Sequence, residues 1–314
     1  MKLHDLGEGG LIRKIRERFG GKAESLPVGI GDDAAVIDLP PGHSLVFCAD
    51  LVAENTHFLR NLHPPDSVAY KAIAANVSDV AAMGGVATHF LISLSAPGPL
   101  EWSWFEEFFR GVENACRAFD IALAGGDSAS SEQIFIDVSM IGRVRSGHAI
   151  RRAGARPGDR IYVSGFLGSS ALGLERLKAG QMNDPSVRRH LYPESRYRIG
   201  AAIADKAHAM IDVSDGLSSD LTHILEESKV SARIYKDRLP AWPGAEEHHV
   251  LHGGEEYELI IVAPELPGEL EGVKLTHIGE IVESVTTHQL TLTDGVSEAP
   301  LKPLGWQHFG KMGS

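Results

Sequence analysis

The sequence lacks several features that would assign it to a common class of protein. No stretch approaches the roughly 18 uninterrupted apolar residues that a membrane-spanning helix needs. The first residues turn acidic at once and lack the apolar core of a secretory signal. Only two cysteines occur, Cys48 and Cys116, and they do not form a CxxC motif. We therefore expect no membrane association, no disulfide framework and no zinc ribbon, and we expect a reducing, cytoplasmic location.

Basic residues are also scarce. The 30 lysines and arginines stand against 42 aspartates and glutamates, which gives a formal net charge of −12 at pH 7. An acidic chain repels the phosphate backbone of nucleic acids. The clearest basic group, Arg151, Arg152 and Arg156, is too small to cover a duplex. We expect no nucleic-acid partner, and any anionic substrate would need a cation between it and the protein.

The common nucleotide-binding motifs are missing as well. No Walker A loop and no eukaryotic protein-kinase motif set occurs. Gly29-x-Gly31-x-x-Ala34 matches the dinucleotide fingerprint, but that motif must open a helix. Residues 35–39 instead have the pattern of a short strand that ends at two prolines. Any ATP chemistry must therefore use a less common scaffold.

The length of 314 residues suggests two domains, at roughly 150 residues each. Residues 145–158 carry glycine, arginine and a proline with little apolar content, so we predict domains over 1–148 and 149–314. Hydrophobic periodicity predicts helices over 8–19, 67–83 (with Asp66 as N-cap) and 102–119, one ending near Lys178 and one ending near Ser228. It predicts strands over 35–39, 44–52, 91–95, 121–124, 135–144, 160–164, 210–213, 256–263 and 275–282. Both halves mix strands and helices, which predicts two α/β or α+β domains.

Aspartates stand beside small residues at several predicted junctions. They are Asp32, Asp33, Asp50, Asp79, Asp127, Asp212 and Asp215. Taken singly, most have a simpler interpretation as turn residues or helix caps, and Asp215 before Gly216 is one example. Asp79 fits this interpretation least, because it lies inside an alanine-rich helical pattern where aspartate is a poor helix former. Asn76 precedes it by three residues and lies on the same side of that helix.

Convergence of these carboxylates would have a chemical consequence. Two unit charges 4 Å apart repel by about 4 kcal/mol at an effective dielectric constant near 20. A cluster of carboxylates therefore takes up protons or binds cations. Carboxylate oxygens without nearby histidine or cysteine favour Mg²⁺ or Ca²⁺ over zinc, and Mg²⁺ is usually shared with substrate phosphates. Bound Mg²⁺ would supply the positive charge that an acidic protein needs to hold ATP, and the family resemblance described next implies several such ions.

Six segments together resemble one known family. They are Gly29–Val36, Asn76–Gly85, Gly125–Ser128, Arg152–Asp159, Asp212–Leu217 and Gly253–Leu259. In this order they resemble thiamine-monophosphate kinase, of the aminoimidazole-ribotide-synthetase-like (PurM-like) ATP-binding superfamily. The resemblance runs from about residue 6 to Phe309. It implies an N-terminal α/β domain whose strands pair with a second subunit to close a barrel, hence a homodimer, and a C-terminal α/β domain.

The resemblance also implies a reaction and its residues. ATP would transfer its γ-phosphoryl group in line to thiamine monophosphate, giving thiamine diphosphate. The implied metal ligands are Asp33, Asp50, Asp79, Asp127, Asp212 and Asp215. The implied ATP contacts are Gly126, Asp127, Arg152 and Ser214, and the implied contacts to thiamine phosphate are His57, Glu255 and Trp306. The acceptor phosphate is mostly dianionic at pH 7, with a second pKa near 6, so we expect no general base and no covalent phosphoenzyme.

Some alternatives stay open at this point. By pattern alone, packing is the slightly better interpretation of Trp306, and His57 fits a surface or core histidine. Glu255 fits a solvated strand edge and Arg152 a linker residue. The family commonly has Ser-Thr where this chain has Cys48-Ala49, which predicts an altered magnesium requirement. It also has threonine at Ser128 and aspartate at Glu256. Another ATP-dependent synthetase of the superfamily, or a catalytically silent nucleotide-binding protein, remains an alternative function.

Overall fold

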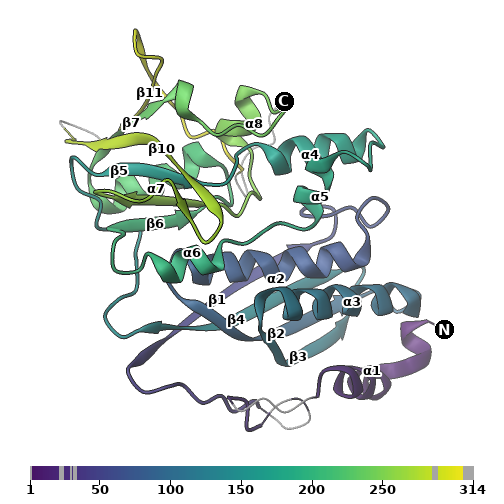
Figure 1. Cartoon of the computed structure of the whole chain (residues 1–314). Coiled ribbons are helices and arrows are strands. Elements are labelled where there is room, and N and C mark those ends of the chain that lie inside the picture. The colour runs from purple at the N-terminus through teal and green to yellow at the C-terminus, as the bar shows by residue number, and fades with distance from the viewer. Residues whose placement is uncertain (1, 21–24, 29, 31–33, 285–288, 307–314) are drawn as a thin grey trace. The chain divides into compact units, whose positions relative to one another are not determined.

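The computed structural model describes residues 2–20, 25–28, 30, 34–284 and 289–306 (Figure 1). The chain divides into two compact units. The first comprises Met1–Val80 and Gly85–Gly147, and the second comprises Ala81–Gly84 and His148–Ser314. Both contain mixed helix and sheet, as the sequence predicted. Within the described part of the chain, no helix is both long enough and apolar enough to span a bilayer.

The first unit has a four-stranded sheet in the order β1-β4-β2-β3. The strands are β1 (His43–Ala53), β2 (Val86–Ala96), β3 (Ala122–Ser130) and β4 (Phe135–Arg145). Only the β2–β3 pair among them is parallel. The helices are α1 (Leu3–Phe19), α2 (Pro65–Ala82) and α3 (Trp102–Phe119), of which α2 and α3 lie across one face of the sheet (Figure 1).

This sheet buries one face and exposes the other. Along β4, Ile136, Val138 and Met140 are completely buried and alternate with more exposed residues. Gly142 continues the buried set, and a Cβ there would lie 2.5 Å from Val80 of α2, so this face packs on the helix. On β1 the opposite face carries Phe47, which is 65% exposed.

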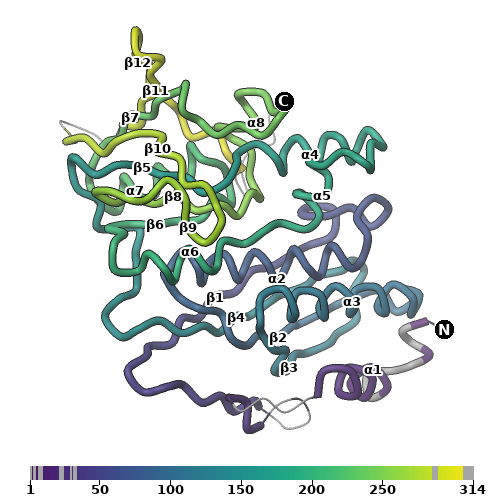
Figure 2. Tube along the Cα trace, in the orientation of Figure 1, coloured from purple at the N-terminus to yellow at the C-terminus, as the bar shows by residue number. Residues whose placement is uncertain are grey.

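The second unit has one larger sheet, in the order β12-β11-β7-β10-β5-β8-β6, with β9 paired to β10. The strands are β5 (Arg160–Ser164), β6 (Ala209–Asp212), β7 (Ser231–Tyr235), β8 (Leu259–Ala263), β9 (Glu269–Leu270), β10 (Val273–Val282), β11 (Leu290–Thr293) and β12 (Glu298–Pro300). The helices are α4 (Ser169–Lys178), α5 (Pro185–Leu191), α6 (Tyr197–Ala202), α7 (Leu217–Ser228) and α8 (Glu247–His252), with a 3₁₀ turn at Lys236–Arg238. The trace in Figure 2 shows β11 and β12 as a hairpin at one edge.

Both faces of this larger sheet are covered. Ile161 of β5 and Leu217 of α7 belong to one apolar core, whereas Tyr162 of β5 and Ile199 of α6 belong to another. Successive residues of β5 thus enter different cores, as expected for a strand buried on both sides. Such a strand gives a continuous apolar run rather than an alternating one, which is why β5 was predicted with its observed bounds.

A buried ion-pair network ties the start of β8 to the α5–α6 region. Glu258 is fully buried, and Arg196 donates to both of its carboxylate oxygens at 2.6 Å. Arg189 donates to the same carboxylate at 3.0 Å, and the Ser164 hydroxyl donates at 2.6 Å. Bidentate arginine pairing and full satisfaction of the oxygens offset the cost of removing this charge from water. The network fixes the chain immediately after residues 253–257.

Some predicted elements were wrong at their bounds. The strand expected over 35–39 is only a single bridge between Val28 and Val36. Asp66 lies in the first turn of α2 rather than before it. The strand expected from residue 256 begins at Leu259, because Glu255 and Tyr257 have left-handed φ values of 58° and 55°. Backbone N–H groups of residues 255–257 instead donate to the carbonyls of residues 213 and 214.

Glu256 makes the stability of the second unit depend on pH. It is 2% exposed, accepts hydrogen bonds from the Ser169 hydroxyl (2.6 Å) and the Ser170 N–H (2.8 Å), and burial raises its pKa to about 7. The folded state then holds more protons than the unfolded state between about pH 4.5 and 7, so the unfolding free energy falls as pH rises through this window. We expect Glu256→Gln to reduce that fall by up to a few kcal/mol, since one pKa unit corresponds to about 1.4 kcal/mol.

Urea unfolding at pH values from 5 to 8 measures this dependence. The matched control is Glu227→Gln on α7, where the side chain is exposed and the pH slope should not change. An unaltered slope in Glu256→Gln would contradict the prediction.

Candidate functional site

The predicted site residues are divided between the two units. Asp33 lies outside the described residues. The first unit contains Asp50, His57, Asp79, Gly126 and Asp127, and the second contains Arg152, Asp212, Ser214, Asp215, Glu255 and Trp306.

In the first unit, two aspartates that are distant in sequence meet. Asp50 lies on β1 opposite Val138, so its side chain is on the face that packs against α2, the helix that carries Asp79. The two carboxyl groups are hydrogen-bonded to each other. Burial raises the pKa of Asp50, the hydrogen bond with Asp79 opposes this rise, and the negative charge of Asp137 adds to it. This Asp50–Asp79 pair is the most direct convergence of carboxylates in this unit.

Asp137 was missed in the sequence. It lies in β4 opposite Leu51 of β1 and Ser93 of β2, and it accepts a hydrogen bond from the Ser139 hydroxyl at 3.1 Å. Its signal was a charged residue inside an otherwise apolar strand pattern, since a carboxylate there must be exposed or paired. Its side chain is on the same face of the sheet as Leu51, opposite to the face that carries the Asp50–Asp79 pair, and its negative charge acts on Asp50 from there.

Cys48, which stands where the family commonly has serine, faces helix α2. It precedes Asp50 by two residues on β1, so both side chains are on one face of the sheet. Its thiol lies 3.6 Å from the carbonyl oxygen and 3.7 Å from the side-chain oxygen of Asn76. Asn76 is fully buried, and its amide donates to the Ala72 carbonyl at 3.0 Å. Cys48 of β1 and Asn76 of α2 are therefore in polar contact, two and three residues from Asp50 and Asp79 respectively.

Asp127 and Gly126 lie away from this pair. Asp127 is inside β3 rather than after it, and β3 is three strands from β1, which corresponds to about 14 Å at 4.8 Å per strand. Its carboxylate accepts the Ser128 N–H at 2.8 Å. A Cβ at Gly126 would lie 2.0 Å from the Ile92 carbonyl oxygen, so packing against β2 alone requires glycine there. The structure does not join these two residues to Asp50.

His57 lies in the turn that follows β1. Its Nδ1 atom accepts the Ala53 N–H at 3.0 Å. A neutral ring with this acceptor carries its hydrogen on Nε2. That atom is suited to donate to an anionic oxygen.

In the second unit, the loop of residues 212–216 presents two carboxylates. Asp212 ends β6 and is buried, and Asp215 is partly exposed. Helix α7 begins after Gly216, which is its N-cap residue, so Asp215 is not the cap that its position suggested. Gly216 adopts a φ of 120°, which favours glycine.

Asp220, a residue that the sequence analysis missed, holds this loop. Its Oδ2 atom accepts the N–H groups of Ser214 (3.1 Å), Asp215 (3.1 Å) and Gly216 (2.9 Å). Burial raises its pKa to about 8, with the charges of Asp212 and Asp215 adding to the rise and the backbone donors opposing it. Its signal was an aspartate in the first turn of a helix, where backbone N–H groups lack partners.

Glu255 and Trp306 lie beside the same loop. The Glu255 N–H donates to the Ser214 carbonyl at 2.7 Å, and the Trp306 N–H donates to the Asp215 carbonyl at 3.1 Å. The Trp306 ring is 54% exposed. Ser214, Asp215, Glu255 and Trp306 thus gather at one place although they span 93 residues of sequence.

Arg152 is placed differently. Its carbonyl accepts the Ser228 hydroxyl at 3.0 Å, at the end of α7 opposite to the 212–216 loop. The side chain is exposed. Its contact with ATP stays a prediction.

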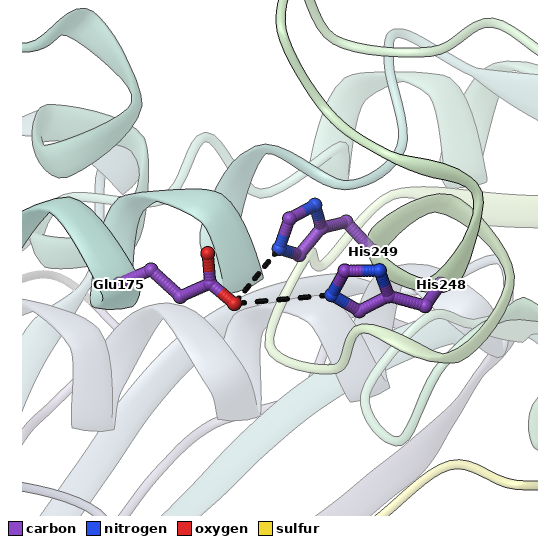
Figure 3. Close-up of side chains that lie close together, drawn as sticks. All are labelled: Glu175, His248 and His249. Carbon is purple, nitrogen blue, oxygen red and sulfur yellow. Dashed lines mark ion pairs between the residues drawn. The ribbon is translucent and has the colours of Figure 1, made fainter.

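Glu175, His248 and His249 form a further cluster with metal-ligand chemistry (Figure 3). The Glu175 Oε1 atom lies 3.1 Å from His249 Nε2 and 3.8 Å from His248 Nε2. However, His249 Nδ1 accepts the Glu246 N–H at 3.0 Å in the cap of α8, which leaves the hydrogen of a neutral ring on Nε2. A metal would need that Nε2 lone pair and would break the cap, so the contacts favour a polar contact between α4 and α8 over a metal site.

A cavity of about 620 Å³ in the first unit is lined by none of the predicted residues. Arg60, Trp104 and several prolines surround it. It does not coincide with the candidate site.

Comparison with known families assigns both halves of the chain. The N-terminal domain of AIR synthase related proteins matches residues 31–144, and the C-terminal domain matches residues 156–289. Thiamine-monophosphate kinase of Escherichia coli O157:H7 is 37% identical over 87% of each chain. The enzyme of Aquifex aeolicus is 35% identical over 98% of this chain and all of its own.

Solved structures agree with these similarities. AaThiL complexed with AMPPCP and TMP superposes with a TM-score of 0.78 at 34% identity, over 98% of this chain and 99% of that one. Thiamine-monophosphate kinase from Stenotrophomonas maltophilia K279a gives 0.79 at 31% identity, over 91% and 96% of the two chains. These matches confirm the predicted two-domain fold. The chain belongs to the thiamine-monophosphate kinase family, within the AIR synthase related proteins.

Proposed function

We propose that this protein transfers the γ-phosphoryl group of ATP directly to thiamine monophosphate, forming thiamine diphosphate with the help of Mg²⁺. The observation that carries the proposal is the Asp50–Asp79 pair, in which two carboxyl groups from β1 and α2 are held in contact. A relative that is 34% identical over nearly the whole chain was solved with AMPPCP and TMP. The family and the acidic chemistry therefore support the same reaction.

The donor groups present fit magnesium. They are hard carboxylate oxygens, and burial raises the pKa of Asp50, a cost to its charged form that a bound cation would offset. When bound, Mg²⁺ would supply positive charge between the carboxylates and the phosphate oxygens. We assign this role to Asp50 and Asp79 in the first unit and to Asp212 and Asp215 in the second. Asp33 and Asp127 are further ligands only by family resemblance.

The 212–216 loop can hold phosphate only through a cation. Backbone N–H groups at the start of a helix usually bind anions directly. Here the N–H groups of residues 214–216 are all directed to Asp220. The loop therefore offers carboxylates to its ligand rather than N–H donors, and an ATP phosphate would be repelled without a metal ion.

The neighbouring residues suit the cationic end of the acceptor. Thiamine phosphate carries a positively charged thiazolium ring. The half-exposed Trp306 ring and the Glu255 carboxylate lie next to the 212–216 loop, and a cation over an aromatic face gains roughly 0.5–2 kcal/mol. The acceptor phosphate is its own nucleophile, so the residues act by positioning and charge and none is needed as a base.

We also propose that the protein acts as a homodimer. Several large apolar side chains occupy the face of the first unit's sheet that its helices leave uncovered: Leu45, Phe47, Leu51, Leu91 and Phe135. Apolar patches of this kind mark interaction sites. A second copy pairing through this face would bury them.

The activity test uses purified protein with ATP, Mg²⁺ and thiamine monophosphate. We expect equal amounts of ADP and thiamine diphosphate, separated by chromatography, and no product after chelation of divalent metal. Tight ATP binding without turnover, or turnover only with a purine-pathway precursor, would contradict the proposal.

Asp79→Asn tests the metal role. Asparagine keeps the shape but removes the charge, so we expect kcat to fall by on the order of 10²–10³-fold, several kcal/mol in the barrier. The matched control is Asp120→Asn, at the left-handed C-cap of α3, which asparagine tolerates. An unchanged kcat in Asp79→Asn, with the fold intact by circular dichroism, would refute the role.

Phe47→Asp tests the dimer. A charge on the exposed face should prevent its burial, so light scattering coupled to size exclusion should report a dimer for the wild type and a monomer for the variant. Val296→Asp, at an apolar residue that is 97% exposed in the second unit, should remain dimeric. A monomeric wild type would argue against the interface.

A further inference from the structure

A buried histidine lies behind the candidate substrate residue Glu255. His190, on α5, is only 1% exposed. Its Nδ1 atom is 3.0 Å from the Ser170 hydroxyl oxygen and 3.7 Å from the Glu255 Oε2 atom. A polar ring buried to this extent needs partners, and both of these come from outside its own helix. The three residues, from α4, α5 and the 253–258 segment, form a contact chain that the sequence analysis did not predict.

The backbone around His190 is rigid. Helix α5 begins at Pro185, and the Asp184 carboxylate caps it by accepting the Ser186 N–H at 2.9 Å. Helix α4 approaches so closely that a Cβ at Gly173 would lie 2.2 Å from the Ser186 carbonyl oxygen. This close packing fixes where the imidazole can lie.

The backbone of Glu255 is also fixed, in a conformation that costs free energy. Its φ of 58° is in the left-handed region, which a glutamate rarely adopts. The hydrogen bond from its N–H to the Ser214 carbonyl keeps it there. Left-handed residues outside glycine persist where the surroundings enforce them, and they gather at functional sites. The result is a carboxylate that touches His190 on one side while its side chain stays 29% exposed.

We propose that His190, supported by Ser170, is a positioning residue that orients the Glu255 carboxylate toward the cationic part of the phosphoryl acceptor. The imidazole Nδ1 atom, held by the Ser170 hydroxyl, lies within ion-pair distance of one Glu255 oxygen, and the exposed part of the carboxylate is left for the ligand. The inference rests on the proposed function, because it assigns His190 to acceptor binding rather than to ATP binding. It therefore predicts a change in KM for thiamine monophosphate and no comparable change in KM for ATP.

The test compares KM for thiamine monophosphate with KM for ATP in His190→Gln. We expect the first to rise about tenfold and the second to change less than about twofold, the size expected for one charge-assisted contact. In a Glu255→Ala background, His190→Gln should add no further rise, since the two residues act through one contact. Ser170→Ala should also raise KM for thiamine monophosphate, but by less. This variant replaces His190→Gln as the test if His190→Gln does not fold.

His208→Gln is the matched control, since His208 also pairs with a carboxylate of the second unit, at 2.9 Å from Asp159. It should leave the ratio of the two KM values unchanged. Equal rises in both KM values in His190→Gln, or the same rise with Glu255 already removed, would overturn the inference while the proposed function stands. Wild-type protein that does not phosphorylate thiamine monophosphate would overturn both.

Discussion

Repulsion between like charges is the constraint on which this protein's site depends. Two carboxyl groups, Asp50 and Asp79, are in contact in the first unit, and the negative charge of Asp137 acts on Asp50 from the other face of the sheet. In the second unit, burial raises the pKa of Asp220 to about 8, and the negative charges of Asp212 and Asp215 add to the rise. Folding tolerates such clusters only because packing elsewhere stabilises them. A divalent cation bound among these carboxylates would remove the repulsion between them and attract phosphate groups.

The scaffold places these charges on parts that cannot easily move apart. β1 and α2 hold the Asp50–Asp79 pair across the buried face of a sheet, and Asp220 holds the 212–216 loop through three backbone hydrogen bonds. The Glu258 network anchors the segment that carries Glu255. A charge held rigidly costs no reorganisation during the reaction, which is how electrostatic catalysis gains its strength.

Much of the fold could be predicted because long periodic segments report burial directly. The bounds of α3 and β5 were predicted correctly from apolar spacing alone. The short helices α5, α6 and α8 were not predicted, since six or seven residues hold too little periodicity. Family resemblance pointed to Asp50, Asp79, Asp212 and Asp215, but Asp220, Asp137 and His190 could not be found that way. Their importance arises from partners distant in sequence, such as the 214–216 backbone and Glu255.

The most direct test of the account is to locate the metal. Crystals grown with Mn²⁺ in place of Mg²⁺ and a non-hydrolysable ATP analogue would give anomalous diffraction at each bound ion. The account predicts peaks at about 2.0–2.2 Å from the carboxylate oxygens of Asp50 and Asp79, and of Asp212 and Asp215, the coordination distance of a small hard cation. Density for the nucleotide with no peak at any of these carboxylates would contradict it.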